Sequence, residues 1–293
     1  MKKVFRLSFF VLLALMLCTA CKSENDGNET ITEQSVNNYF NVVSDKNLGT
    51  STVFTGAGYQ IRLNYTRATA DIIISGLKLN GELVYPDIKL SGLPFKVTDD
   101  GWFSIEATNL TPSSNGISAG PIFDRFKMNL LQRVVDEYYM PAIYVEMTLN
   151  NRFNVISSSP RQFFFGPTTT VDNNGTESVN KNSQYVFELS FDSKTLTLTI
   201  PSASFIPSMP ALNIAMKAIP FTISDAGIIT FEASSITPAI ADVPYPNFPI
   251  SNLKGKIDLK GSMEISFDCE PAKAPGKYHV SATGNYINNL IIE

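Results

Sequence analysis

Residues 93–112 read LPFKVTDDGWFSIEATNLTP, and residues 219–238 read IPFTISDAGIITFEASSITP. Residue 93 aligns with residue 219, so the offset is 126 residues, and the whole stretch aligns without a gap. The same offset holds upstream, where it relates Tyr59 to Tyr185, Leu63 to Leu189, Thr69 to Thr195, Ile74 to Ile200 and Ile88 to Ile214. Chance identities would scatter over several offsets. The shared offset therefore predicts two copies of one folding unit.

Both copies show the period-two alternation of apolar and polar residues that is typical of half-buried strands. Two of the predicted strands in each copy are separated by Asp99-Asp100-Gly101 or by Asp225-Ala226-Gly227. Both tripeptides predict tight hairpin turns, because Asp bonds nearby backbone groups and Gly accepts a positive φ. We expect strands over residues 58–65, 69–79, 87–95, 102–110, 142–150 and 152–158, and over residues 184–191, 195–205, 213–221, 228–236, 262–269 and 277–285.

Residues 123–137, FDRFKMNLLQRVVDE, allow two interpretations. Several of their apolar residues recur every four positions, as they would on one face of a helix. In the second copy, the segment that we align with residues 129–134 is 252–257, where Gly255 argues against a helix. We therefore predict a strand in both copies, and a short helix in the first copy is the alternative.

The strand count bounds the architecture. About eight strands joined by short turns suit an up-and-down β-barrel, whose closure removes exposed strand edges. The predicted fold class is therefore all-β, with two tandem barrels of about eight strands each; two β-sandwiches are the alternative. We place one barrel domain at residues 37–160 and the other at residues 161–293, because residues 157–161 (SSSPR) combine turn-forming residues with a proline.

The N-terminus has the features of a signal peptide. Residues 4–17 form an apolar run after three residues that include two lysines, and the run is shorter than the about 20 residues of a transmembrane helix. It ends in Cys18-Thr19-Ala20-Cys21, where the last three residues resemble the bacterial lipobox and Cys18 replaces the usual aliphatic residue. The resemblance implies a signal peptide over residues 1–21 and acylation of Cys21; plain secretion is the alternative. Residues 22–36 are polar and predict a flexible tether.

Composition excludes several classes of function. The net charge is −4 and the pI is about 5.2, so we expect no attraction to nucleic acid. The single histidine, His279, shares parity with Lys277 and so belongs to the polar face of its strand. Without a histidine-based triad or metal-ligand spacing in the sequence, we expect neither enzymatic activity nor a cofactor. Cys269, the one cysteine after Cys21, is predicted to be a small core residue.

The repeat keeps one pair of carboxylates, Glu106 and Glu232. Trp102 and Glu106 share one face of their predicted strand, and Glu232 occupies the equivalent face in the second copy. If that face lines a barrel lumen, the carboxylates could bind the polar end of a ligand and Trp102 could form an apolar wall. A solvated outer face or a structural ion pair is the competing interpretation.

The second copy also carries a family resemblance. Residues 205–210 (FIPSMP), followed by Ile214 and residues 219–221 (IPF), resemble a motif of calycin-like lipoproteins of Bacteroides-type bacteria. Residues 278–284 (YHVSATG) resemble their closing strand, whereas the first copy departs from the motif with LNGELV at residues 79–84. The resemblance covers most of the second domain and, more weakly, the first. It implies a lipocalin-like β-barrel, and no functional residue is carried over.

These features predict a lipoprotein of the cell envelope, attached to the outer membrane through its lipid anchor and either periplasmic or surface-exposed. One hypothesis is a binding module in which a barrel holds a small apolar or amphipathic ligand. The other is a non-enzymatic structural or assembly lipoprotein, with filled barrels and outer surfaces that contact other envelope components. The filling of the lumens discriminates between them, because a ligand needs space inside the barrel.

Overall fold

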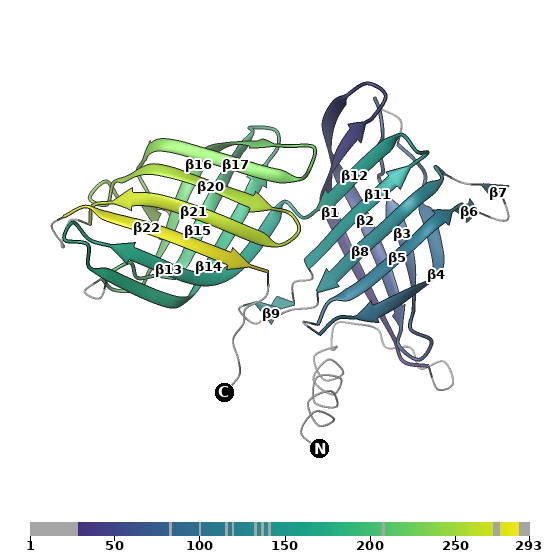
Figure 1. Cartoon of the computed structure of the whole chain (residues 1–293), viewed down its shortest axis with the longest axis horizontal. Coiled ribbons are helices and arrows are strands. Elements are labelled where there is room, and N and C mark those ends of the chain that lie inside the picture. The colour runs from purple at the N-terminus through teal and green to yellow at the C-terminus, as the bar shows by residue number, and fades with distance from the viewer. Residues whose placement is uncertain are drawn as a thin grey trace, which may run out of the picture. The chain divides into compact units, whose positions relative to one another are not determined.

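The computed structural model describes residues 29–81, 84–99, 101–114, 117–118, 120–131, 134–135, 138–139, 142–206, 209–271 and 276–286 (Figure 1). Every regular element in these ranges is a β-strand. The main strands of the first half are β1 (Ile31–Asp45), β2 (Thr50–Asn64), β3 (Thr69–Ser75), β4 (Ile88–Val97), β5 (Phe103–Leu110), β8 (Phe123–Leu131), β11 (Ala142–Leu149) and β12 (Phe153–Ser158). Its short strands are β6 (Ser113–Ser114), β7 (Ile117–Ser118), β9 (Val134–Val135) and β10 (Tyr138–Tyr139).

The second half repeats this plan. Its main strands are β13 (Arg161–Val171), β14 (Glu177–Ser190), β15 (Thr195–Ala203), β16 (Leu212–Ile223), β17 (Ile228–Ile236), β20 (Ile250–Asp258), β21 (Ser262–Cys269) and β22 (Tyr278–Asn285). The short strands β18 (Ala239–Ile240) and β19 (Val243–Pro244) pair with each other, and β18 also pairs with β16.

Each half closes into an eight-stranded antiparallel barrel. The first has the strand order β1-β12-β11-β8-β5-β4-β3-β2, and the second runs β13-β14-β15-β16-β17-β20-β21-β22, with β22 pairing back to β13. Consecutive main strands are neighbours in both, which is the up-and-down arrangement. The structure therefore confirms two tandem barrels rather than sandwiches. Closure gives every main strand a neighbour on both sides, which explains how long alternating strands limit edge-to-edge pairing.

The sequence repeat is also a repeat of strand register. Phe95 pairs with Ile105 across β4 and β5, and Phe221 pairs with Phe231 at the equivalent place in β16 and β17. The turns between these strands are alike too: Gly101 donates its N–H to the Thr98 carbonyl, and Gly227 does the same to Ser224. Both glycines have positive φ, 86° and 74°. The predicted hairpin turns are confirmed, and Asp100 lies outside the described residues.

The ambiguous segment forms a strand where the structure describes it. In β8, Phe126, Met128 and Leu130 are all fully buried, so every second residue points inward and the helix alternative does not apply to residues 123–131. Our alignment of this segment between the copies was wrong. Lys127 faces Glu106 and Lys254 faces Glu232, so Lys127 corresponds to Lys254 and the local offset is 127 residues. The glycine at position 255 therefore stands where the first copy has Met128.

The first strand starts earlier than the sequence suggests. β1 begins at Ile31, within the segment 22–36 that we expected to be a tether. Ile31 and Gln34 are buried, and the Tyr65 N–H donates to the Thr30 carbonyl at 2.9 Å, so pairing with β2 reaches back to residue 30. The strands of the first barrel thus span residues 31–158, and those of the second span residues 161–285.

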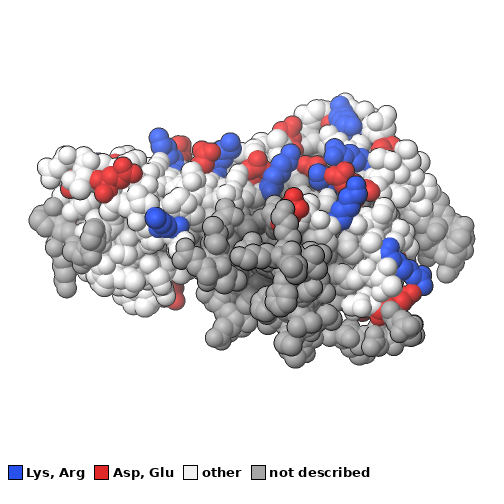
Figure 2. Space-filling view, turned by 60° about the horizontal axis from the view of Figure 1, so that its bottom comes forward, with Lys and Arg blue, Asp and Glu red and all other residues white. Residues whose placement is uncertain are grey.

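Both barrels have apolar interiors, and their outer faces are polar. Fully buried residues include Ile61, Ile72 and Ile105 in the first barrel and Phe187, Leu198 and Ile229 in the second. Cys269 is a buried free cysteine, as predicted. On the face shown in Figure 2, basic and acidic side chains are interspersed rather than segregated. A search of the described residues for a helix long and apolar enough to cross a bilayer finds no candidate.

Candidate functional site

Glu106 lies on the outside of the first barrel. Its side chain is 55% exposed, and its carboxylate accepts an ion-paired hydrogen bond from Lys127 Nζ at 2.8 Å. This hydrogen bond and the Lys127 charge, aided by Arg125 and Lys96 and opposed by partial desolvation, hold the Glu106 pKa below its usual value. The inward face of β5 is instead the one that carries Ile105, which is fully buried.

Glu232 and Trp102 follow the same pattern. Glu232 is exposed and faces Lys254 across the β17–β20 pair. Trp102 is half-buried at the end of the β4–β5 hairpin, where its carbonyl accepts the Thr98 N–H at 2.8 Å. The condition for a luminal role of these three residues, that their strand face lines the lumen, is not met. Ligand binding by Trp102, Glu106 and Glu232 stays a prediction.

His279 is exposed, in agreement with its predicted place on a polar strand face. Its Nδ1 lies 2.9 Å from Asp268 Oδ1, and Asp268 also accepts hydrogen bonds from Asn252 Nδ2 at 2.7 Å and from Lys277 Nζ at 3.1 Å. Desolvation alone would raise the Asp268 pKa, but the bonds from His279, Asn252 and Lys277 outweigh it and lower the pKa to about 2. Among the described residues, no group of His, Cys, Asp and Glu has the arrangement of a metal site.

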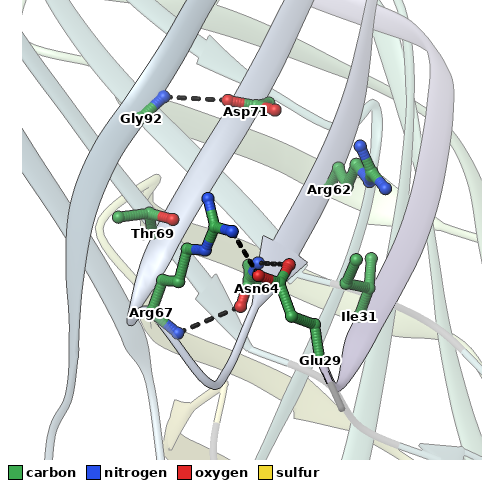
Figure 3. Close-up of a pocket in the computed structure, with 8 residues that line it drawn as sticks. All are labelled: Glu29, Ile31, Arg62, Asn64, Arg67, Thr69, Asp71 and Gly92. Carbon is green, nitrogen blue, oxygen red and sulfur yellow. Dashed lines mark hydrogen bonds and ion pairs between the residues drawn. The ribbon is translucent and has the colours of Figure 1, made fainter. Parts of the chain in front are cut away.

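A polar pocket of about 200 Å³ opens on the outer face of the first barrel (Figure 3). It is lined by Glu29, Ile31, Arg62, Asn64, Arg67, Thr69, Asp71 and Gly92. Its polar groups are already engaged with one another: Glu29 pairs with Arg67 and accepts from Asn64 at 2.7 Å, and Asp71 accepts the Gly92 N–H at 2.8 Å. A ligand would have to displace these bonds, so we look for the site inside the barrels instead.

Gln34 is a buried glutamine inside the first barrel. The bond from Tyr65 N to Thr30 O sets the β1–β2 register, which places Gln34 opposite Ile61, and residues opposite each other in an antiparallel pair share one face. Ile61 is buried on the inward face, so Gln34 points inward too. The residue is only 7% exposed, yet neither its Oε1 nor its Nε2 has a hydrogen-bond partner.

Gln162 is the counterpart of Gln34 in the second barrel. It pairs with Phe187, which corresponds to Ile61 at the repeat offset of 126. Unlike Gln34, it is fully bonded: its Nε2 donates to Ser158 Oγ at 3.0 Å and to the Ser159 carbonyl, and its Oε1 accepts from the Tyr286 hydroxyl. Ser158 ends β12 and Ser159 lies between β12 and β13, so Gln162 is satisfied by Tyr286 and by the residues that lead into its own strand, whereas Gln34 has no partner.

The remaining interior polar groups repeat this contrast. In the second barrel, Thr168 donates to Ser183 Oγ at 2.5 Å and bonds the Tyr185 hydroxyl. Burial raises the Tyr185 pKa, although the bonds from Thr168 and Ser183 oppose it. In the first barrel, Asn41 and Ser157 are both at least 99% buried, and their side-chain polar atoms lack partners. Gln184, on the outward face of β14, is the second barrel's one unpaired buried amide nitrogen in the described residues.

Unpaired buried amides are costly, which makes Gln34 informative. Burying a polar group without a hydrogen bond costs about 1–3 kcal/mol in protein mutational data. Native proteins rarely keep buried polar groups without hydrogen bonds, and such a group commonly binds a water, an ion or a ligand. A carboxamide is neither an acid, a base nor a nucleophile near neutral pH. The arrangement in the first barrel can therefore hold a molecule by donating and accepting hydrogen bonds, and it supplies no reactive group of its own.

Sequence analysis missed this glutamine pair because its offset is 128, not 126. At the offset of 126, Gln34 aligns with Pro160. The first copy has two more residues than the second between this glutamine and the second strand, so an alignment with a two-residue gap in the second copy would have matched Gln34 with Gln162. Cys21, the predicted lipidation site, lies outside the described residues.

Comparisons with known proteins give no closer identification. No protein-family model matches the sequence, and no curated protein matches it. A candidate outer membrane protein of Bacteroides fragilis is 16% identical, with 86% of this chain and 96% of that chain covered and a TM-score of 0.34. A Nostoc punctiforme protein of unknown function is 11% identical, with coverages of 86% and 95% and a TM-score of 0.24. Transferrin-binding protein B of Haemophilus parasuis is 8% identical, with coverages of 87% and 76% and a TM-score of 0.24. At these values the likenesses establish neither family nor function.

Proposed function

We propose that this chain is a secreted lipoprotein of the cell envelope, anchored through Cys21, whose first barrel binds a small amphipathic ligand. The observation that carries the binding role is Gln34, a 93% buried inward amide whose two polar atoms have no partner in the described part of the chain. Its duplicate, Gln162, shows what such an amide needs inside this barrel type, namely a hydroxyl on Oε1 and acceptors on Nε2. A bound molecule with polar and apolar parts would supply these groups and bury the rest of its surface in the lumen.

The anchor and the envelope location rest on the sequence. The lipobox-like end at Cys21 and the resemblance to calycin-like lipoproteins both support export and acylation. Several acyl chains on one cysteine would give stable attachment, since each buried methylene contributes about 0.8 kcal/mol. A Cys21→Ala variant labelled with radioactive palmitate tests this part: loss of label is expected, and continued acylation would show that the anchor is elsewhere.

The binding role is tested by what the barrels retain in the host. The full chain carrying Cys21→Ala is purified without detergent from the native host, and its organic extract is analysed by mass spectrometry. We expect one enriched small molecule, absent from extracts of the Gln34→Met variant and retained by Gln162→Met. If the three proteins give the same extract, the first barrel does not bind through Gln34.

A structural or assembly role is the second candidate, and the second barrel favours it. Its lumen holds the ring contacts Tyr286–Phe164, Phe164–Phe187 and Phe187–Phe231, at centroid distances of 4.9, 5.8 and 5.6 Å. A lumen filled in this way stabilises the barrel and presents only its outer surface to other envelope components. On this proposal the two barrels have different roles: the second is a structural scaffold, and the first binds the ligand.

A further inference from the structure

In the second barrel, the side chain of Tyr286 satisfies the buried glutamine as a bound ligand would. This residue directly follows β22 and is 4% exposed. Its ring stacks on Phe164 at a centroid distance of 4.9 Å and an interplanar angle of 25°. Its hydroxyl contacts Gln162 Oε1 and the Leu259 carbonyl oxygen, the latter at 3.2 Å. A planar ring and one hydroxyl therefore satisfy the buried glutamine and pack the space beside it.

Among the described residues, the last strand of the first barrel does not continue to a residue in the place of Tyr286. Ile265 pairs with Ala282 and Met263 with Gly284, so Tyr286 continues the inward face of the last strand. In the first barrel the last strand ends at Ser158, and the chain enters β13 at Arg161. β12 has 6 residues against 15 in β1, and the bond from Lys46 N to Arg152 O pairs it with the Asp45 end. The Gln34 end of β1 therefore lies beyond the end of β12.

The aromatic residues that accompany Tyr286 are also missing from the first barrel. Phe187 and Phe231 correspond to Ile61 and Ile105 at the repeat offset. Phe164 pairs with Tyr185, and the β1–β2 register pairs Val36 with Tyr59, so Val36 takes the place of Phe164. Phe164 is fully buried, whereas Val36 is only half-buried although it points inward. At the three positions equivalent to Phe164, Phe187 and Phe231, the first barrel thus carries smaller aliphatic side chains. Its nearby inward rings are Tyr59, opposite Val36, and Phe95, opposite Ile105.

From this difference we infer that the first barrel binds a small phenol, that is, a planar apolar ring that carries a hydroxyl. The hydroxyl donates to Gln34 Oε1, as Tyr286 does to Gln162, and the ring packs against Val36 and Ile61. An acceptor on the ligand takes the Gln34 Nε2 donor. This assignment rests on the proposed binding function of the first barrel and specifies the class of ligand.

Two probes that differ in one hydroxyl test the inference. p-Cresol is the tyrosine side chain without its backbone, and toluene is the same ring without the hydroxyl. Both are titrated by calorimetry into the full chain carrying Cys21→Ala. We expect one p-cresol per chain, bound at least about tenfold more tightly than toluene, which corresponds to about 1.4 kcal/mol. The ratio of the p-cresol affinity to the toluene affinity should fall to about one in Gln34→Met. It should stay unchanged in Gln162→Met, the matched control.

A second variant tests whether Tyr286 acts as an internal ligand. Tyr286→Gly should gain a second p-cresol site with the same preference over toluene. If that variant does not fold, the wild-type comparison decides alone. Equal binding of the two probes, or a preference that survives Gln34→Met, would overturn the phenol assignment. The proposed function would still stand in that case if the host extract contains a Gln34-dependent molecule of another class, and it would fall with the assignment if the extract contains none.

Discussion

The duplicated glutamine gives one substitution with opposite effects in the two barrels. Methionine matches glutamine in length and removes the amide. In ligand-free protein, Gln34→Met removes a buried amide without partners, so we expect stabilisation of the first barrel by about 1–3 kcal/mol. Gln162→Met leaves Ser158 Oγ without its donor and Tyr286 with only the Leu259 carbonyl at 3.2 Å, so we expect destabilisation of the second barrel by about 1–3 kcal/mol.

The chain carries its own reporter for this experiment. Its single tryptophan, Trp102, belongs to the first barrel, so tryptophan fluorescence follows that barrel alone, while far-UV circular dichroism follows both. In guanidinium chloride, with a denaturant slope of about 4 kcal/mol per M, the expected midpoint shifts are about 0.25–0.75 M. The fluorescence midpoint should rise in Gln34→Met and stay unchanged in Gln162→Met. A fall in Gln34→Met would show that the amide is hydrogen-bonded in the ligand-free barrel and would refute the reasoning.

Three further predictions concern other parts of the barrels. The Asp268 pKa of about 2 lies below its ordinary value of 3.8, so its ionised form stabilises the fold above about pH 4, and this contribution disappears as the pH falls through about 2. Asp268→Asn should therefore lower the free energy of unfolding at pH 7 by about 1 kcal/mol, a figure reduced for solvent screening of its half-exposed partners. Equal acid denaturation of the variant and the wild-type protein would contradict this prediction. Burial and the charges of Asp268 and Glu270 raise the Cys269 pKa to about 12, so this thiol should react with a thiol reagent at pH 8 only after unfolding, and rapid labelling of the native protein would contradict its core position. A Cβ on Gly255 would lie 2.3 Å from the Phe231 ring and 2.8 Å from the Glu264 carbonyl oxygen, so Gly255→Ala should destabilise the second barrel by about 1–3 kcal/mol. Phe231→Ile, which restores the Ile105 arrangement, should recover the part of this loss that comes from the ring. No recovery at all would show that the Glu264 carbonyl is responsible.

Much of the fold could be predicted from the sequence because each copy follows simple rules. Alternation identified most of the strands, although β13 was not among them. The ungapped offset predicted that the two copies share a hairpin, in which Phe95 pairs with Ile105 and Phe221 with Phe231. The extent of β1 escaped prediction because residues 31–38 are mostly polar and their pairing depends on β2, far along the chain.

The candidate site was less predictable than the fold. Alternation shows that Glu106 and Ile105 lie on opposite faces of their strand. It does not show which of the two faces points into the closed barrel, because that depends on the packing of all eight strands. Gln34 was hidden by a two-residue shift between the copies. The role of Gln34 cannot be read from its neighbours in the sequence, because it follows from a comparison of the two barrels: Tyr286 bonds the equivalent glutamine in the second barrel, and no such tyrosine is described in the first.

Electron density around Gln34 tests the central claim most directly. Crystals of the full chain carrying Cys21→Ala, purified from the native host without detergent, would show both glutamines in one molecule. The account predicts density of a bound organic molecule within hydrogen-bonding distance of Gln34 Oε1, and Tyr286 in the equivalent place at Gln162. A Gln34 amide bonded only to protein groups or water, in a lumen without such a molecule, would contradict it.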